Sequence, residues 1–286
     1  MKRILLVALG LLILSTAPVW AAETGTAGAA GPILRDGVGA RSAAMGGAYI
    51  AVADDVTAVY WNPAGLTRLE APTVTTMHAQ WFAGSNYDYI GWATPLKYGS
   101  LGISYLSLST TGITNSDGTD TNASTDVLYG AYGANFGRWR WGVTGKYVRE
   151  DLLGQTGNGL GIDCGVQTDL TDHYRLGAVI QDILGTRIKW DNSPEEEVPR
   201  NYRIGLSYHQ DALLMALEYE KAADFEAKHF GLEYTVNNFL KIRGGVKGND
   251  LTAGIGLTKD RWQFDYAYCA GDLGNTNRLS LSVKLK

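Results

Sequence analysis

From residue 72 to the end of the chain, apolar side chains recur at every second position, and this alternation restricts the fold more than any other feature. Near the C-terminus, Leu279, Leu281 and Val283 alternate with Ser280 and Ser282. A period of two puts successive side chains on opposite faces of an extended strand, whereas a helix repeats every 3.6 residues. The sequence therefore predicts an all-β chain whose strands each carry one apolar and one polar face.

Such runs predict about fourteen strands. We expect them at residues 72–83, 86–96, 99–108, 125–137, 139–150, 156–169, 173–184, 199–209, 211–220, 227–236, 239–247, 250–258, 261–270 and 277–286. The alternation breaks at Tyr105-Leu106, so we expect a β-bulge or a misplaced strand boundary there. An even number of antiparallel strands would return both ends of the wall to one rim.

The links between the predicted strands form two classes. Long polar links are expected at 110–125, 151–157, 185–199, 221–226 and 271–275, and mostly tight turns occupy the other connections. This asymmetry is typical of transmembrane β-barrels of the outer membrane. A soluble sandwich or propeller also has strands with one apolar face. An unbroken meander, 16 Tyr and 8 Trp, and an export leader favour the membrane barrel.

The first 22 residues are typical of a signal peptide. Lys2 and Arg3 precede an apolar run over residues 4–14, and Val19-Trp20-Ala21 resembles a cleavage site. The alternative is an uncleaved anchor, but the apolar run is short for a membrane-spanning helix. We therefore expect three parts: signal peptide 1–22, N-terminal segment 23–70 and barrel 71–286.

Residues 39–66 differ in character from the strands that follow. Small residues crowd positions 40–48, and Gly46-Gly47 permits a bend. Either Asp54 or Asp55 is expected to cap a short helix over residues 56–61. The helix is expected to stop at the Asn-Pro pair 62–63, because proline cannot continue a helical hydrogen-bond ladder. The sequence therefore predicts a compact segment with a short helix.

This segment resembles the N-terminal part of FadL-type outer-membrane transporters and, more closely, that of their PorV/PorQ relatives. The matching residues are Met45-Gly46-Gly47-Ala48, Ala53-Asp54-Asp55 and Asn62-Pro63-Ala64-Gly65. A capped helix with an Asn-Pro stop, common in any protein, is the alternative. The resemblance implies an N-terminal plug, or hatch, inside an outer-membrane barrel. The plug motif would comprise Met45, Gly46, Gly47, Asp54, Asp55, Asn62, Pro63 and Ala64.

Fourteen strands should enclose a lumen that is wet or plugged. The polar faces of neighbouring predicted strands carry Glu218, Glu220, Glu233, Lys241 and Arg243. Cross-strand ion pairs among these strands are expected to stiffen the wall. The functional alternative is a polar selectivity path through the lumen.

Other chemistry finds little support in the sequence. Four scattered histidines have no metal-ligand spacing, and no catalytic or phosphate-binding motif occurs, so neither an enzyme nor a cofactor is expected. A net charge of -4 gives no reason to expect nucleic acid. Cys164 and Cys269 are predicted on opposite faces of the sheet, hence as free thiols.

Two functions follow from the resemblance. A PorV/PorQ-like barrel would bind or pass a secreted protein or hydrophobic ligand, as in type IX secretion, and the chain length favours this branch. A FadL-like barrel would take up hydrophobic small molecules, with a movable plug or an opening in the wall. A passive structural barrel is the third possibility. In each case outer-membrane lipid is the expected surrounding.

Overall fold

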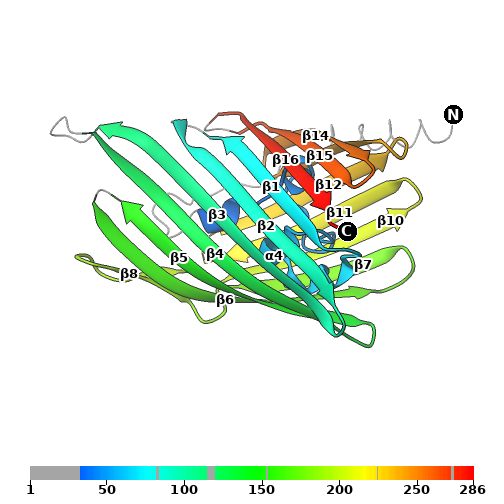
Figure 1. The fold of residues 1–286 in the computed structure, drawn as a ribbon, viewed down its shortest axis with the longest axis horizontal. Helices are drawn as coiled ribbons and strands as arrows, with labels where there is room; N and C mark the ends of the chain where they lie inside the picture. Colours follow the sequence, from blue (N-terminus) through cyan, green and yellow to red (C-terminus); the bar gives the residue numbers. More distant parts are fainter. Residues whose placement is uncertain (1–32, 82–83, 115–119, 153, 224, 272–273) are drawn as a thin grey trace.

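The computed structural model describes residues 33–286 apart from 82–83, 115–119, 153, 224 and 272–273. The predicted signal peptide and the start of the predicted plug, residues 23–32, lie outside this part. Fourteen of the sixteen described strands form a closed antiparallel barrel, drawn in Figure 1. The predicted fold class is thereby confirmed.

The barrel strands follow one another around the wall, and β5–β6 pairing closes the circle. They are β1 (Thr73–Gln80), β2 (Asn86–Leu96), β3 (Gly99–Thr114), β4 (Asp120–Phe136), β5 (Trp139–Leu152), β6 (Gln155–Asp169), β7 (Tyr174–Gln181), β10 (Asn201–Gln210), β11 (Leu213–Ala222), β12 (Phe225–Thr235), β13 (Leu240–Lys247), β14 (Asp250–Lys259), β15 (Trp262–Cys269) and β16 (Thr276–Lys284). Two short strands, β8 (Thr186–Trp190) and β9 (Glu196–Val198), lie between β7 and β10.

The two rims of the barrel differ. The links after β2, β4, β6, β10, β12 and β14 are short, and we call this end the turn rim and the other end the loop rim. At the turn rim the Leu285 amide donates to the Pro72 carbonyl at 2.7 Å, so the wall begins and ends there. Along the wall, outward side chains such as Leu281 are exposed and apolar. Such a belt suits a lipid-facing surface.

The predicted long link at 110–125 is wrong. The strand β3 continues to Thr114, β4 already begins at Asp120, and the two still pair beyond a register shift between Thr110 and Ile113. The stretch is rich in Thr and Ser, and threonine suits an extended backbone. Ile113 is its one large apolar residue, so a search for alternation did not find these strand ends.

The bulge expected at Tyr105-Leu106 does not occur, whereas the boundary of this strand was misplaced, because β3 ends at Thr114 and not at residue 108. Pairing of β3 with β2 and β4 is continuous through both residues. Tyr105 faces outward and is 43% exposed, whereas Leu106 faces the lumen and is fully buried. The side-chain direction alternates as usual, but the inner face is apolar at this height. The break in the pattern therefore marks a property of the lumen.

The region 185–199, predicted as a loop, contains β8 and β9. Residues 182–185 interrupt the wall strand that β7 begins, with positive φ angles at Asp182 (55°) and Gly185 (70°). Beyond the interruption, β8 resumes antiparallel pairing with β6 from Leu160 to Gly157. It also pairs with β9, so the two short strands extend the wall toward the loop rim.

Residues 33–71, which we call the inner segment, lie within the barrel (Figure 1). They form α2 (Ile33–Asp36), α3 (Ala40–Ala44), α4 (Ala58–Trp61) and the 3₁₀ helix η1 (Pro63–Arg68). Most of their side chains are buried. In the described part of the chain, every helix is too short or too polar to cross a membrane.

A closed barrel pairs the backbone of every wall strand, and such barrels resist detergent. We therefore expect the purified protein to migrate as a compact band on a gel when unheated and more slowly after boiling. Recovery of the protein in the soluble fraction after carbonate extraction of membranes would contradict a membrane barrel.

Candidate functional site: the barrel lumen

The inner segment approaches the wall so closely that glycine is required on both sides. A Cβ atom on Gly46, whose φ is +63°, would lie 2.5 Å from the Val246 carbonyl oxygen. A Cβ on Gly245 would lie 2.3 Å from the Gly46 nitrogen. Further glycines whose Cβ would collide with the inner segment are Gly91, Gly102, Gly133, Gly142, Gly165, Gly177, Gly231 and Gly254. The segment therefore fits a groove that side chains would fill.

A buried carboxylate holds the middle of the inner segment. One oxygen of Glu218 accepts hydrogen bonds from the Tyr49 and Ile50 amides, both at 2.8 Å. The other oxygen lies 2.6 Å from the guanidinium of Arg203, and both charged side chains are 1% exposed. Arg203 also lies 4.7 Å from the ring centre of Trp61. Glu218 thus forms an ion pair with a residue of β10 and hydrogen bonds with the inner segment. We had expected its partners on the strands that carry Lys241 and Arg243.

Glu220 is placed in the same way. Its side chain accepts from Asn201 on β10 at 2.7 Å and lies 3.0 Å from His229 Nε2. The other ring nitrogen of His229 lies 2.8 Å from the Gly46 carbonyl oxygen. Both partners of the His229 ring are oxygen atoms, one on the wall and one on the inner segment. The predicted residues Gly46 and Glu220 are therefore brought together through His229.

The expected cross-strand pairs occur around Glu233. This carboxylate lies 2.7 Å from Arg243 and 3.3 Å from Lys241, both on β13. It also accepts from Arg41 of the inner segment at 2.9 Å. Arg41 in turn lies 2.6 Å from Asp54. The wall charges therefore continue into the inner segment, which the sequence did not indicate.

The predicted helix cap differs in detail. The helix α4 begins at Ala58, later than expected, and no side chain caps its N-terminus. Asp55 instead accepts from the Thr57 amide at 2.9 Å, while Asp54 pairs with Arg41. Thr57 already has helical dihedral angles. An Asx turn from Asp55 to Thr57 therefore replaces the cap.

Asn62 and Pro63 join two helices. The α-helix α4 ends at Trp61, and Pro63 begins η1 in the first-turn position that proline favours. Asn62 Oδ1 accepts from the Ala64 amide at 3.2 Å, and its Nδ2 donates to Ile50 and Val166 carbonyl oxygens at 3.0 and 3.1 Å. The 3₁₀ helix η1, which begins at Pro63 and ends at Arg68, thus lies between Asn62 and the first wall strand.

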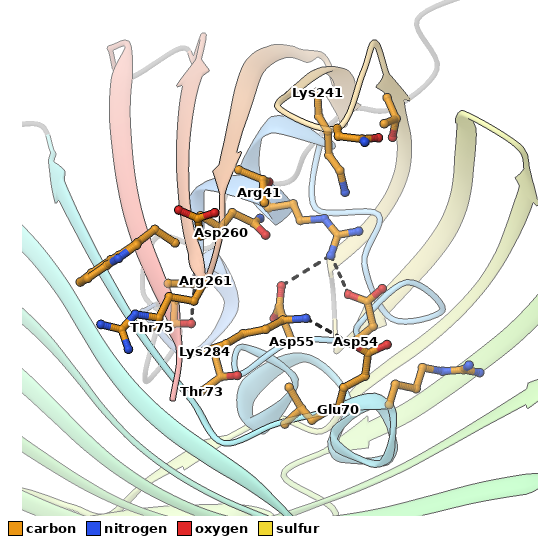
Figure 2. A pocket seen from close by; sticks show the side chains of 18 of the residues that line it. Arg41, Asp54, Asp55, Glu70, Thr73, Thr75, Lys241, Asp260, Arg261 and Lys284 are labelled. Carbon is orange, nitrogen blue, oxygen red and sulfur yellow. Dashed lines mark hydrogen bonds and ion pairs between the residues drawn. The ribbon is translucent and has the colours of Figure 1, made fainter. Parts of the chain in front are cut away.

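A polar cavity of about 600 Å³ lies between the inner segment and the turn rim (Figure 2). Its lining carries charges of both signs: Arg41, Asp54, Asp55, Arg68, Glu70, Arg175, Lys241, Asp260, Arg261 and Lys284. Burial, together with Asp54, raises the pKa of Asp55 despite the nearby Arg41. Burial and the neighbouring Arg175 lower the pKa of Arg68 to about 10. This chamber favours water and ions over hydrocarbon.

The lumen has the opposite character toward the loop rim. Apolar side chains of the inward faces of β3, β4, β5 and β8 pack together there with Leu34 and Tyr60 of the inner segment. We call these wall residues the apolar tier: Leu106, Leu108, Val127, Tyr129, Val148, Ile188 and Trp190. Of these, Leu106, Val127, Val148 and Ile188 are fully buried. The tier went unrecognised in the sequence, although the break at Tyr105-Leu106 was its signal.

No family model and no curated sequence matches the chain. Solved structures do. The toluene transporter TbuX of Ralstonia pickettii is 14% identical with a TM-score of 0.64, over 87% of this chain and 99% of that one. The toluene transporter TodX of Pseudomonas putida is 13% identical with a TM-score of 0.65, over 87% and 99%. A FadL homologue of Pseudomonas aeruginosa is 11% identical with a TM-score of 0.64, over 87% and 98%.

The chain therefore has the fold of FadL-like barrels. At these identities the likeness establishes architecture, including a short helical N-terminal segment. None of the matching structures described above is a component of protein secretion, so the closer PorV/PorQ resemblance and a role in type IX secretion gain no support.

Proposed function

We propose that this protein is a channel of the bacterial outer membrane that takes up hydrophobic small molecules of the size of monoaromatic hydrocarbons. The apolar tier carries the proposal. A lumen that faced only water and ions would not bring Leu106, Val127 and Ile188 together on its inner surface. The likeness to TbuX and TodX, both called toluene transporters, agrees with such a cargo.

The inner segment is the barrier in this channel. Its side chains fill the lumen between the apolar tier and the polar cavity, and hydrogen bonds from several strands hold it. A molecule that enters at the loop rim would bind in the apolar tier once Leu34 and Tyr60 move aside. Passage therefore requires displacement of the inner segment or a route that avoids it.

The interrupted strand offers such a route. Between Leu160 and Cys164, β6 has no ladder partner on β7 or β8, although the Ile183 amide donates to the Ile162 carbonyl oxygen at 2.9 Å. Leu184, at the interruption, is 73% exposed. An apolar molecule that left sideways here would avoid the charged cavity at the turn rim, but it would have to pass the buried ion pairs of Lys146 with Asp163 and Asp182 at the interruption.

The test is uptake of radiolabelled toluene by cells of a Gram-negative host that has no channel of this kind. We expect the wild-type protein to accelerate early uptake and Val148→Asp to abolish the acceleration, because a carboxylate in the apolar tier repels hydrocarbon. Val148→Thr, which keeps the shape, should have a smaller effect. The heat-dependent gel shift verifies folding of each variant. Wild-type cells that take up toluene no faster than cells without the protein would refute the proposal.

A further inference from the structure

The loop-side mouth of the lumen contains a buried carboxylate without a partner. Glu150, near the end of β5, faces the lumen and is 9% exposed. No hydrogen bond or ion pair joins it to any residue in the described part of the chain. Val148 of the apolar tier lies two residues earlier on the same inner face of β5. A desolvated carboxylate in such a place is costly unless something neutralises it.

An indole ring lies beside this carboxylate. Glu150 is directly opposite Gly157 on β6, and Gly157 is directly opposite Trp190 on β8. A Cβ atom on Gly157 would lie 2.9 Å from the Trp190 ring. The indole therefore lies over Gly157, the residue between Trp190 and Glu150 across the strands. The Trp190 Nε1 group is buried and has no hydrogen-bond partner among the residues that the structure describes. A carboxylate and an aromatic face thus lie next to each other on the inner wall.

A second carboxylate reaches the same place. Glu196 on β9 is directly opposite Ile188 on β8, and paired residues project to the same face of a sheet. Ile188 is fully buried in the apolar tier. Glu196 itself is exposed. It therefore lies above the tier on the lumen side, where it adds negative charge to the entrance.

The nearest inward cation of β5 is already neutralised. Lys146 lies 2.9 Å from Asp163 and 2.9 Å from Asp182, and all three side chains are almost completely buried. It therefore supports the interrupted strand and does not compensate Glu150. The mouth presents negative charge, an indole face and an apolar floor.

We infer that this mouth binds organic cations, in particular ammonium groups attached to an aromatic or aliphatic body. The ammonium would lie between Glu150 and Glu196 and against the ring of Trp190, while the body rests on Val148 and Ile188. Carboxylates and indole faces both attract such cations, most strongly where water is excluded. The inference rests on the proposed function and narrows its substrates: apolar amines pass in preference to apolar acids.

The probes are benzylammonium, its neutral isostere ethylbenzene and the anion phenylacetate, each titrated calorimetrically into the purified full-length protein. We expect benzylammonium to bind about tenfold more tightly than ethylbenzene, a difference of about 1.4 kcal/mol, and phenylacetate to bind least. Glu150→Gln should remove the preference for benzylammonium while affinity for ethylbenzene stays constant. Trp190→Leu, which keeps an apolar side chain, should weaken benzylammonium binding to a smaller degree.

Glu195→Gln is the matched control. Glu195 belongs to the same hairpin, but its side chain is exposed and lies 3.5 Å from Lys189, so its loss should change no affinity. Equal binding of the three probes would overturn the inference. Preference for phenylacetate would also overturn it. That result would indicate Arg35 as the binding group, because its Nε and Nη2 are buried without partners among the described residues. A protein that carries toluene yet shows no benzylammonium preference keeps the proposed function and loses only this inference.

Discussion

Replacement of Arg203 by methionine should lower the free energy of unfolding by about 3–5 kcal/mol, because it leaves buried carboxylates without their counter-charge. Arg203 lies 2.6 Å from Glu218 and 3.5 Å from Glu220, and each of the three side chains is at most 3% exposed. The same change removes the cation from the face of Trp61. Denaturant unfolding and refolding in lipid vesicles measures the loss.

Arg149→Met is the control for this prediction. Arg149 faces outward near the loop rim and pairs at 3.0 Å with Asp151, where both side chains are well exposed. Pairs of this kind contribute little to stability, so the free energy of unfolding should stay unchanged within error. Equal effects of the two substitutions would show that the Arg203 cluster is solvated, which would contradict the burial of its side chains.

Leu281→Arg should lower the free energy of unfolding by about 2–4 kcal/mol if the outer face meets lipid, because a charged side chain near the middle of a barrel wall is unfavourable in hydrocarbon. Leu281 projects outward from β16 between Phe264 of β15 and Thr76 of β1. Its neighbour Ser282 faces the polar cavity and lies 2.8 Å from the Thr75 hydroxyl. Ser282→Arg adds charge to a wet chamber and should cost much less.

The same unfolding experiment in lipid vesicles compares these two substitutions. A larger loss of stability for Ser282→Arg than for Leu281→Arg would mean that the lumen face and the lipid face of the strands are assigned the wrong way round. It would also remove the basis for locating the apolar tier, because both assignments rest on the same side-chain alternation.

The wall was predictable because each strand obeys a local rule. Alternation located every barrel strand to within a few residues, except where polar Ser and Thr form the strand ends of β3 and β4. The hairpin of β8 and β9 escaped because it is short: β8 does alternate, with Ile188 and Trp190 on one face, but it has only five residues, and β9 has three. Cys164 and Cys269 are free, as their predicted faces indicated.

The lumen was harder to predict because its contacts join distant positions. Glu218 caps amides 169 and 168 residues earlier in the chain. Such a pairing depends on where the inner segment lies, and neither strand alternation nor charge balance fixes that position. The apolar tier is an exception, because it left a signal in the sequence. Leu106 and Leu108 lie on the face of β3 opposite to Tyr105, so both faces of this strand carry apolar side chains.

The inner segment is fastened to opposite parts of the wall at once. Thr144 of β5 donates to the Val59 carbonyl at 2.9 Å, and Thr252 of β14 donates to the Ala44 carbonyl at 3.0 Å. Between these points the close contacts at Gly46 leave no room for a gradual tilt. Release on one side therefore strains the other, and the contacts must break together. Currents through single molecules should accordingly switch between a closed and an open level in discrete, all-or-none steps. Replacement of either threonine by valine should shorten the time that the channel spends in the closed state.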